Sequence, residues 1–398
     1  MPDLSTRLIH HPYLPPQGFE AVSPGVFKAS TVFFGSVEEL RHREWRDKSG
    51  YTYGLHGTPT TFILEERIAT LEGGAHCVLV PSGLAAVGLV DMAFLRQGDE
   101  LLIPDNAYGP NKSLAEGELK GWGITTRYYD PMSPASLAEL ITPATRLVWL
   151  EAAGSITLEF PDLPALVSVV RAANADQTRN ARPILMALDN TWGAGIAFSP
   201  FELGVDVSMQ ALTKYPSGGA DVLMGSVVTR DSALHQTLLM THMRVGHGVG
   251  GNDAELVLRG LHSVALRYAV QDAATRTLAR WMQTRAEVAT VLHPALPDSP
   301  GHEHWIRDAK GAACLFSAVF KPEHSQARVD AFCDRLRLFK LGWSWAGPVS
   351  LCAPYDVPSL RKQPWPHHGA LVRFAVGLES VADLQADLDQ ALQALSPA

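Results

Sequence analysis

The segment that most constrains the fold is an apolar run that ends in a lysine, Ser208-Met209-Gln210-Ala211-Leu212-Thr213-Lys214-Tyr215. It continues a buried-looking run that begins at Val205, and a Pro-Ser-Gly-Gly turn follows it. A lysine is usually a solvated surface charge. When a lysine is desolvated, its amine can lose its proton and form a Schiff base with a carbonyl cofactor. Lys214 is therefore a candidate for covalent cofactor binding.

Similar apolar runs of strand length recur along the chain, with helical segments between several of them. The strands that we expect lie at 77–80, 100–103, 147–150, 184–188, 205–209 and 222–228. Helices are expected at 64–72, from Leu84 onward and at 163–175. Strands that alternate with helices predict an α/β fold, with a mostly parallel central sheet covered by helices on both faces.

The two ends of the chain depart from this pattern. Residues 1–57 are rich in Pro, Gly, His and Arg without periodicity, which predicts an N-terminal arm that lies over another surface. Residues 58–253 then form the α/β domain, and residues 254–398 a smaller C-terminal α+β domain. Its expected elements are a long helical stretch at 254–282, strands at 314–320 and 371–376, and helices at 327–338 and 381–395.

Composition excludes several classes of protein. The formal charge is −8 over 398 residues and no Lys/Arg-rich run is present, so no nucleic-acid partner is expected. Neither a secretory signal at the N-terminus nor an uninterrupted apolar span is found, which favours a cytoplasmic protein without a membrane partner. The four scattered cysteines are expected to be reduced core thiols. The fifteen histidines lack metal-ligand spacing, so no metal site is expected.

Two further features suit a cofactor bound by Lys214. Asp189 follows the apolar run 184–188, and ligands of open α/β sheets bind at the carboxyl ends of strands. Its alternative role is that of a turn or N-cap residue. The second feature is the strand-to-helix turn Pro81-Ser82-Gly83-Leu84, whose free N–H groups could hold a phosphate, with the Thr213 hydroxyl beside it. A lysine, a carboxylate that keeps a pyridine nitrogen protonated, and a phosphate site together favour pyridoxal 5′-phosphate (PLP).

Arg373 lies inside the apolar strand expected at 371–376. An unpaired buried charge is very costly, so this guanidinium either faces a ligand or points to water from an edge strand. A bidentate grip on the α-carboxylate of an amino-acid substrate would explain it.

With these candidates in place, longer stretches of the chain resemble the Cys/Met-metabolism family of PLP-dependent enzymes, which have the aspartate-aminotransferase-like fold type I. The resemblance covers nearly the whole chain and is greatest to the cystathionine β-lyase branch. The matching stretches are Tyr53-Gly54-Leu55-His56-Gly57-Thr58-Pro59-Thr60, Leu71-Glu72-Gly73-Gly74, Asp105-Asn106-Ala107-Tyr108, Leu150-Glu151, Gly154-Ser155-Ile156-Thr157, Asp189-Asn190-Thr191-Trp192, Thr213-Lys214-Tyr215, Leu258-Arg259-Gly260-Leu261, His293-Pro294-Ala295-Leu296, Ser344-Trp345 and Arg373.

The resemblance implies roles for individual residues. Tyr108 would stack on the cofactor ring, and Tyr53 would reach a neighbouring subunit's site from the arm, so that Lys214, Tyr108 and Tyr53 are the expected catalytic residues. A homotetramer built from close dimers, with sites shared across subunits, follows from this arrangement. The phosphate pocket would be lined by Ser82, Gly83, Leu84 and Thr213, and the substrate carboxylate would be positioned by Ser344 and Arg373, with Trp345 nearby.

Two departures affect the phosphate end of the pocket. Leu55 stands where many relatives have an arginine that pairs with the phosphate, and Ala211 where they often have a serine. Either the following residue, His56, replaces the arginine, or backbone and hydroxyl groups hold most of the phosphate.

The activity that the resemblance implies is cleavage of the C–S bond of L-cystathionine by α,β-elimination, a step of transsulfuration and methionine biosynthesis. It would yield homocysteine, pyruvate and ammonia. The alternatives are amino-acid racemisation, notably of alanine, and a γ-lyase or γ-synthase reaction. A non-catalytic binding protein on the same fold is disfavoured, because Lys214, Asp189 and Arg373 are all intact.

Overall fold

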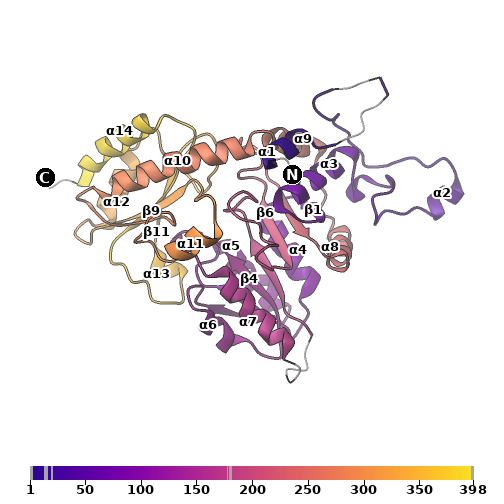
Figure 1. Ribbon diagram of the computed structural model, residues 1–398, viewed down its shortest axis with the longest axis horizontal. Helices are drawn as coiled ribbons and strands as arrows, with labels where there is room; N and C mark the ends of the chain where they lie inside the picture. The colour runs from indigo at the N-terminus through magenta and orange to yellow at the C-terminus, as the bar shows by residue number, and fades with distance from the viewer. Residues whose placement is uncertain (1–2, 13–16, 19–20, 177, 179–181, 396–398) are drawn as a thin grey trace.

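A computed structural model describes residues 3–12, 17–18, 21–176, 178 and 182–395. Two sheets with their helices form the body of the molecule, and an arm that carries α2 projects from it (Figure 1). The long helix α10, Val264–Gln283, runs from the neighbourhood of the larger sheet to the flank of the smaller one. The expected α/β fold with a second, smaller sheet domain is confirmed.

The larger sheet has seven strands in the order β1-β7-β6-β5-β4-β2-β3. β7 is antiparallel to both of its neighbours, and the remaining pairs are parallel. The strands are β1 His76–Val80, β2 Glu100–Pro104, β3 Thr125–Tyr129, β4 Thr145–Glu151, β5 Leu185–Asp189, β6 Val207–Ala211 and β7 Gly225–Thr229.

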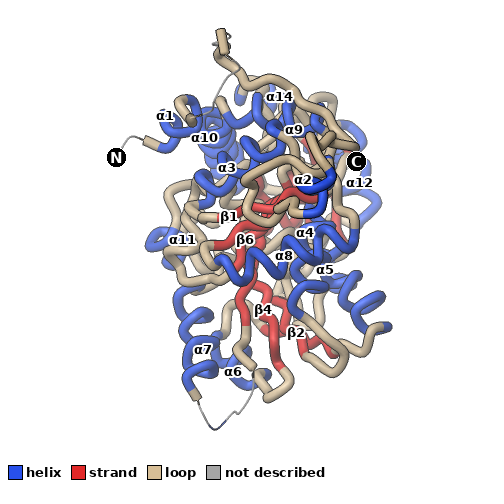
Figure 2. Tube along the Cα trace, turned by 90° about the vertical axis from the view of Figure 1, so that its right-hand side faces the viewer, coloured by secondary structure: helices blue, strands red, loops and turns tan. Residues whose placement is uncertain are grey.

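Helices cover both faces of this sheet, as its apolar strands require (Figure 2). Alternate strand residues enter two separate cores: Val148 and Leu188 pack with α3 and α7, whereas Trp149 and Ala187 pack with α4 and α8. The helices of this half are α3 Pro59–Glu72, α4 Gly83–Phe94, α5 Gly109–Leu114, the π-helical turn η2 Ala115–Leu119, α6 Pro134–Leu140, α7 Leu163–Ala175, α8 Ser232–Val245 and α9 Gly251–Leu261.

The smaller sheet has the order β10-β11-β12-β9-β8 and is antiparallel except between β10 and β11. Its core is aromatic, with Phe316 and Phe374 stacked at 4.9 Å between ring centroids. The elements are β8 Val288–Leu292, α11 His302–Asp308, β9 Leu315–Phe320, α12 Gln326–Arg335, β10 Lys340–Leu341, β11 Leu351–Tyr355, α13 Val357–Leu360, β12 Leu371–Ala375, α14 Val381–Leu392 and η4 Gln393–Leu395.

Several expected elements need correction. The helical stretch 254–282 is two helices, α9 and α10, which break at His262 and Ser263. The break leaves the Gly260 carbonyl free to accept a hydrogen bond from Arg267 Nη2 at 2.8 Å. The strand expected at 222–228 begins only at Gly225. β3, β8, β10 and β11 were not predicted.

The described part of the arm has short helical elements: α1 Leu4–Ile9, α2 Val37–Arg41 and η1 Gly54–His56. It is tied to the larger half by a short ion pair, 2.6 Å between Lys48 Nζ and Glu65 Oε2 of α3. Two apolar side chains of the arm, Val22 and Phe33, are each 94% exposed. The domain limits at residues 57 and 253 stay a prediction.

Three negative observations apply to the part of the chain that is described. No helix is long and apolar enough to cross a membrane. No group of His, Cys, Asp and Glu side chains is arranged to hold a metal ion. The four cysteines are buried and unpaired.

Candidate active site

The Lys214 amine lies at the junction between the two halves of the molecule. Lys214 follows β6, and its Nζ donates a 2.8 Å hydrogen bond to Ser344 Oγ, which belongs to the smaller half. Trp345 is beside it, with its ring centroid 5.6 Å from Nζ. Burial, helped by the nearby positive charge of Arg373, lowers the pKa of Lys214 to about 8. An appreciable fraction of the amine is therefore neutral near pH 8 and able to act as a nucleophile or base.

The turn that carries Lys214 is fixed by backbone contacts. The Lys214 N–H donates to the Ala211 carbonyl at 3.1 Å, and the Gly218 N–H donates to the Lys214 carbonyl at 2.9 Å. Arg267 donates to the Tyr215 carbonyl at 2.7 Å. Gly260 of α9 lies so close that a Cβ there would be 2.2 Å from the Pro216 carbonyl oxygen. Glycine at position 260 is thus needed to seat this turn.

Asp189 is the last residue of β5, adjacent to β6. Its Oδ1 accepts hydrogen bonds from the Thr191 N–H at 3.0 Å and from the Thr191 hydroxyl at 2.5 Å. Burial raises the pKa of Asp189, while the two Thr191 hydrogen bonds and the Lys214 charge oppose that rise. Among the described residues nothing hydrogen-bonds Oδ2. That oxygen is available to a protonated ring nitrogen, as the PLP prediction requires.

The predicted phosphate end lies at the start of α4. Ser82 is the N-cap, and its hydroxyl accepts from the Ala85 N–H at 3.0 Å. At Gly83 a Cβ would lie 2.7 Å from the Cβ of Ala211, so the chain needs glycine here and a small side chain at 211. Leu84 is partly exposed. The Thr213 hydroxyl is paired with the backbone of Met224, donating at 3.3 Å and accepting at 3.2 Å. Backbone N–H groups are therefore the main donors that α4 presents to an anion.

Arg373 lies in β12 between β9 and β11 and is only 6% exposed. Its Nη1 donates a 2.8 Å hydrogen bond to the Ser155 carbonyl, and its guanidinium lies 5.2 Å from the Tyr355 ring centroid. Burial lowers the pKa of Arg373. No ion pair between Arg373 and a carboxylate is found in the described part of the chain. A buried guanidinium without an acidic partner can pair with an external carboxylate, as the prediction for Arg373 requires.

Tyr108 is held by a carboxylate whose role was not predicted. The Tyr108 N–H donates a 2.8 Å hydrogen bond to Glu151 Oε2. Glu151 ends β4 and lies opposite Asp189 in the sheet register. Burial, together with the Asp189 charge, raises the pKa of Glu151 well above its usual range. The available signal was its position, because Glu151 ends an apolar strand just as Asp189 does.

Tyr53 and His56 of the arm are not brought to Lys214. His56 stacks on Trp45 with ring centroids 4.5 Å apart, and its Nδ1 lies 2.8 Å from the Thr52 hydroxyl. Tyr53 is exposed and makes an edge contact with His56. Leu55 and His56 line a pocket with residues of β1 and α8 instead.

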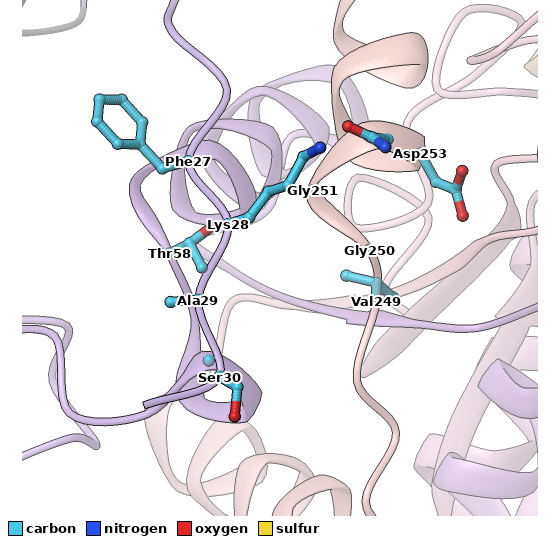
Figure 3. A pocket seen from close by; sticks show the side chains of 11 residues that line it. Phe27, Lys28, Ala29, Ser30, Thr58, Val249, Gly250, Gly251 and Asp253 are labelled. Carbon is cyan, nitrogen blue, oxygen red and sulfur yellow. The ribbon is translucent and has the colours of Figure 1, made fainter. Parts of the chain in front are cut away.

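A cavity of about 530 Å³ lies between the arm and the start of α9 (Figure 3). Phe27, Lys28 and Ser30 form one wall, and Gly250 and Asp253 lie on the other. None of the predicted site residues lines it, so it is separate from the Lys214 site.

The site fits the three requirements of PLP. Lys214 offers the amine, the unpaired oxygen of Asp189 can bind the ring nitrogen, and the close-packed N-terminus of α4 can hold the phosphate.

Comparisons with known proteins agree with this assignment of the cofactor. The sequence profile of the Cys/Met metabolism PLP-dependent enzymes matches residues 5–393. A putative cystathionine β-lyase of Rhizobium johnstonii is 39% identical over 99% of this chain and 96% of its own length. Cystathionine β-lyase MetC of Escherichia coli is 36% identical over 97% of both chains.

Solved structures show the same architecture. The cystathionine γ-synthase of Xanthomonas oryzae pv. oryzae, in complex with aminoacrylate and cysteine, superposes with a TM-score of 0.87 at 29% identity, covering 99% of this chain and 98% of that one. The profile match, the full-length relatives and the common fold give one assignment. The chain belongs to the Cys/Met metabolism family of PLP-dependent enzymes.

Proposed function

We propose that this enzyme cleaves the C–S bond of L-cystathionine by α,β-elimination, consuming one water molecule and yielding homocysteine, pyruvate and ammonia. The observation that carries the proposal is the pair formed by Lys214 and Arg373. Lys214 offers a half-buried amine of lowered pKa, and Arg373 offers a buried guanidinium without an acidic partner among the described residues. The naming of full-length relatives as cystathionine β-lyases supports the choice of substrate.

Each side chain then has a distinct task. Arg373 binds the substrate α-carboxylate, and the Ser344 hydroxyl holds Lys214 Nζ near the same region. Lys214 removes the α-proton as a general base. PLP, when bound, supplies the electron sink for the carbanion, and Asp189 keeps its ring nitrogen protonated. Lys214 or Tyr108 then donates a proton to the departing thiolate sulfur.

The γ-lyase and γ-synthase reactions require a second proton to be removed, from Cβ, whereas racemisation requires only return of the α-proton to the opposite face. Product analysis separates these routes. We expect purified enzyme with L-cystathionine to form pyruvate and homocysteine in equal amounts. Formation of 2-oxobutyrate would instead show the γ route. Wild-type incubation with L-alanine in deuterated water, followed by measurement of both enantiomers, tests for racemase activity.

We also propose a homotetramer in which Tyr53 and His56 complete the site of an adjacent subunit. Exposed apolar side chains on the arm and the separation of Tyr53 from Lys214 in one chain support it. Mixing equal amounts of inactive Lys214→Ala and Tyr53→Phe subunits, with dissociation and reassembly, should restore about a quarter of wild-type activity, because half of the dimers are hybrids and half of the sites in each hybrid have both residues. Absence of any recovery would contradict shared sites. A cytoplasmic location stays a prediction.

A further inference from the structure

A second cluster of charged side chains lies on the segment 356–370, which joins β11 to β12 in the smaller half. The segment begins with α13 and then passes over the turn Asp105-Asn106-Ala107-Tyr108, which follows β2 of the larger half. Six hydrogen bonds link its residues to the larger half, and Arg361 makes three of them.

Arg361 is buried between two carboxylates. Its Nε lies 3.3 Å from Asp105 Oδ2, and its Nη1 pairs with Glu159 Oε1 and lies 3.4 Å from the Thr157 hydroxyl. The side chains of Arg361, Asp105 and Glu159 are 9%, 0% and 8% exposed. This burial distinguishes the ion pairs of Arg361 from solvent-screened surface pairs, which contribute little.

Asp105 also binds the backbone of the segment. The N–H groups of Lys362 and Gln363 donate to its two carboxylate oxygens at 2.8 and 2.9 Å. Lys112 of α5 donates to the Leu360 carbonyl at 2.6 Å. The segment is therefore fastened to the larger half by a side-chain tether and a set of backbone contacts.

The partners of Arg361 lead directly to the proposed substrate site. Glu159 accepts a 3.1 Å hydrogen bond from Asn106 Nδ2, and the Asn106 carbonyl accepts one from the Ser155 N–H at 3.1 Å. The carbonyl of Ser155 is the acceptor for Arg373 Nη1. Thus one buried cation fastens the loop that carries Tyr108 and the loop that orients Arg373.

We propose that Arg361 is a positioning residue, which holds the segment 356–370 across the two halves and thereby fixes the orientation of Arg373. This inference rests on the proposed function, because it takes Arg373 as the receptor of the substrate carboxylate. Without the tether, Ser155 and Arg373 sample more orientations, and less of the protein is ready to bind a carboxylate.

The test uses the PLP-loaded enzyme and two readouts. Hydrogen–deuterium exchange of residues 361–363 reports whether the segment is fastened. The inhibition constant of propanoate, which has a carboxylate but no amine to react with the cofactor, reports on Arg373. In Arg361→Met we expect exchange to become about tenfold faster and the inhibition constant to rise about tenfold, with KM for L-cystathionine rising more than kcat falls.

The matched control is Lys362→Ala. The side chain of Lys362 makes an exposed pair with Glu116, at 3.4 Å, and its Nζ lies 5.8 Å from the Tyr128 ring centroid, so both readouts should stay within about twofold of wild type. Arg361→Lys keeps the charge but loses the planar guanidinium that contacts both carboxylates. Its exchange rate and its inhibition constant for propanoate should lie between those of wild type and Arg361→Met. Wild-type exchange and wild-type propanoate inhibition in Arg361→Met would overturn the proposal.

If Arg361→Met does not fold, the double variant Arg361→Met/Glu159→Gln removes the carboxylate charge left unpaired. A folded double variant with weak propanoate binding supports the tether, whereas one with wild-type binding overturns it. Arg373→Met separates the two hypotheses. If Arg373→Met still binds propanoate normally, the proposed role of Arg373 in carboxylate binding fails. The tether is tested independently, because exchange in Arg361→Met that stays as slow as in wild type would refute it.

Discussion

Replacing Arg373 by methionine should lower activity and raise stability at the same time. Arg373 is 6% exposed, and among the described residues its guanidinium makes one hydrogen bond, which it donates to the Ser155 carbonyl. In the free enzyme this charge has lost its hydration without gaining a carboxylate, so the native state bears a desolvation cost. Methionine is of similar length and needs no hydration.

The magnitudes follow from those contacts. Loss of a buried, charge-assisted pair with the substrate costs about 2–5 kcal/mol, so kcat/KM should fall roughly 30-fold to several thousand-fold. The free protein should gain about 1–2 kcal/mol, seen as a higher unfolding midpoint. The opposite directions distinguish a binding residue from a structural one.

Pyruvate formation from L-cystathionine measures the first effect, and thermal unfolding of the cofactor-loaded protein measures the second. Arg307→Met is the control, because Arg307 is a half-exposed arginine paired with Asp162 and Asp308, and should change kcat/KM by less than about twofold. An Arg373→Met variant that keeps kcat/KM within threefold of wild type, or that unfolds at a lower temperature, would show that Arg373 does not bind the substrate carboxylate at a cost in stability.

Three other substitutions test the phosphate end of the site, Lys214 and a buried carboxylate of α3, Glu72. Gly83→Ala should weaken PLP binding about tenfold in an absorbance titration, because the new Cβ would lie 2.7 Å from the Cβ of Ala211. Adding Ala211→Gly to this variant should restore the affinity, whereas normal affinity in Gly83→Ala alone would contradict the close packing. In the cofactor-free protein, the pKa of Lys214 is about 8, whereas that of a free lysine is 10.5. Between these two pH values the unfolded state binds more protons than the folded state, so the free energy of unfolding should rise with pH by about 2–3 kcal/mol. Denaturant titrations at pH 7.5 and 10 should show this rise in wild type but not in Lys214→Met, and equal rises would exclude it. Burial raises the pKa of Glu72, which accepts a hydrogen bond from the Ser208 hydroxyl, from 4.5 to about 7. The stabilising contribution of the protonated carboxyl is therefore fully present below pH 4.5 and is lost as the pH rises through 7. Glu72→Gln should flatten the decline in the free energy of unfolding between pH 5 and 8, and an unchanged slope would argue against a buried, protonated Glu72.

Much of the fold was predictable because the larger sheet is buried on both faces. Its central strands are continuous apolar runs, and this pattern located β4, β5 and β6 to within a few residues. β3 was missed because it is a partly exposed edge strand of threonine, arginine and tyrosine. β11 contains Pro354, a residue that argues against a strand when the sequence is considered alone.

The candidate site could be predicted where a residue's position along the chain determines its position in space. Lys214 and Asp189 follow adjacent strands, so their proximity follows from the sheet. The environment of Arg361 could not be predicted in that way, since its partner Asp105 is 256 residues away in the chain. Tyr53 and His56 were assigned by family resemblance alone, and one chain by itself does not bring them to Lys214.

Lys214 is proposed to bind the cofactor covalently through its side-chain amine. Borohydride reduction of the PLP-loaded enzyme, followed by proteolysis and mass spectrometry, tests this most directly, because reduction makes the lysine–cofactor link permanent. We predict that a single peptide, the one that contains Lys214, carries the phosphopyridoxyl mass, and that Lys214→Ala carries none. A label on another lysine, or an unchanged label in Lys214→Ala, would show that Lys214 is not the lysine that binds the cofactor.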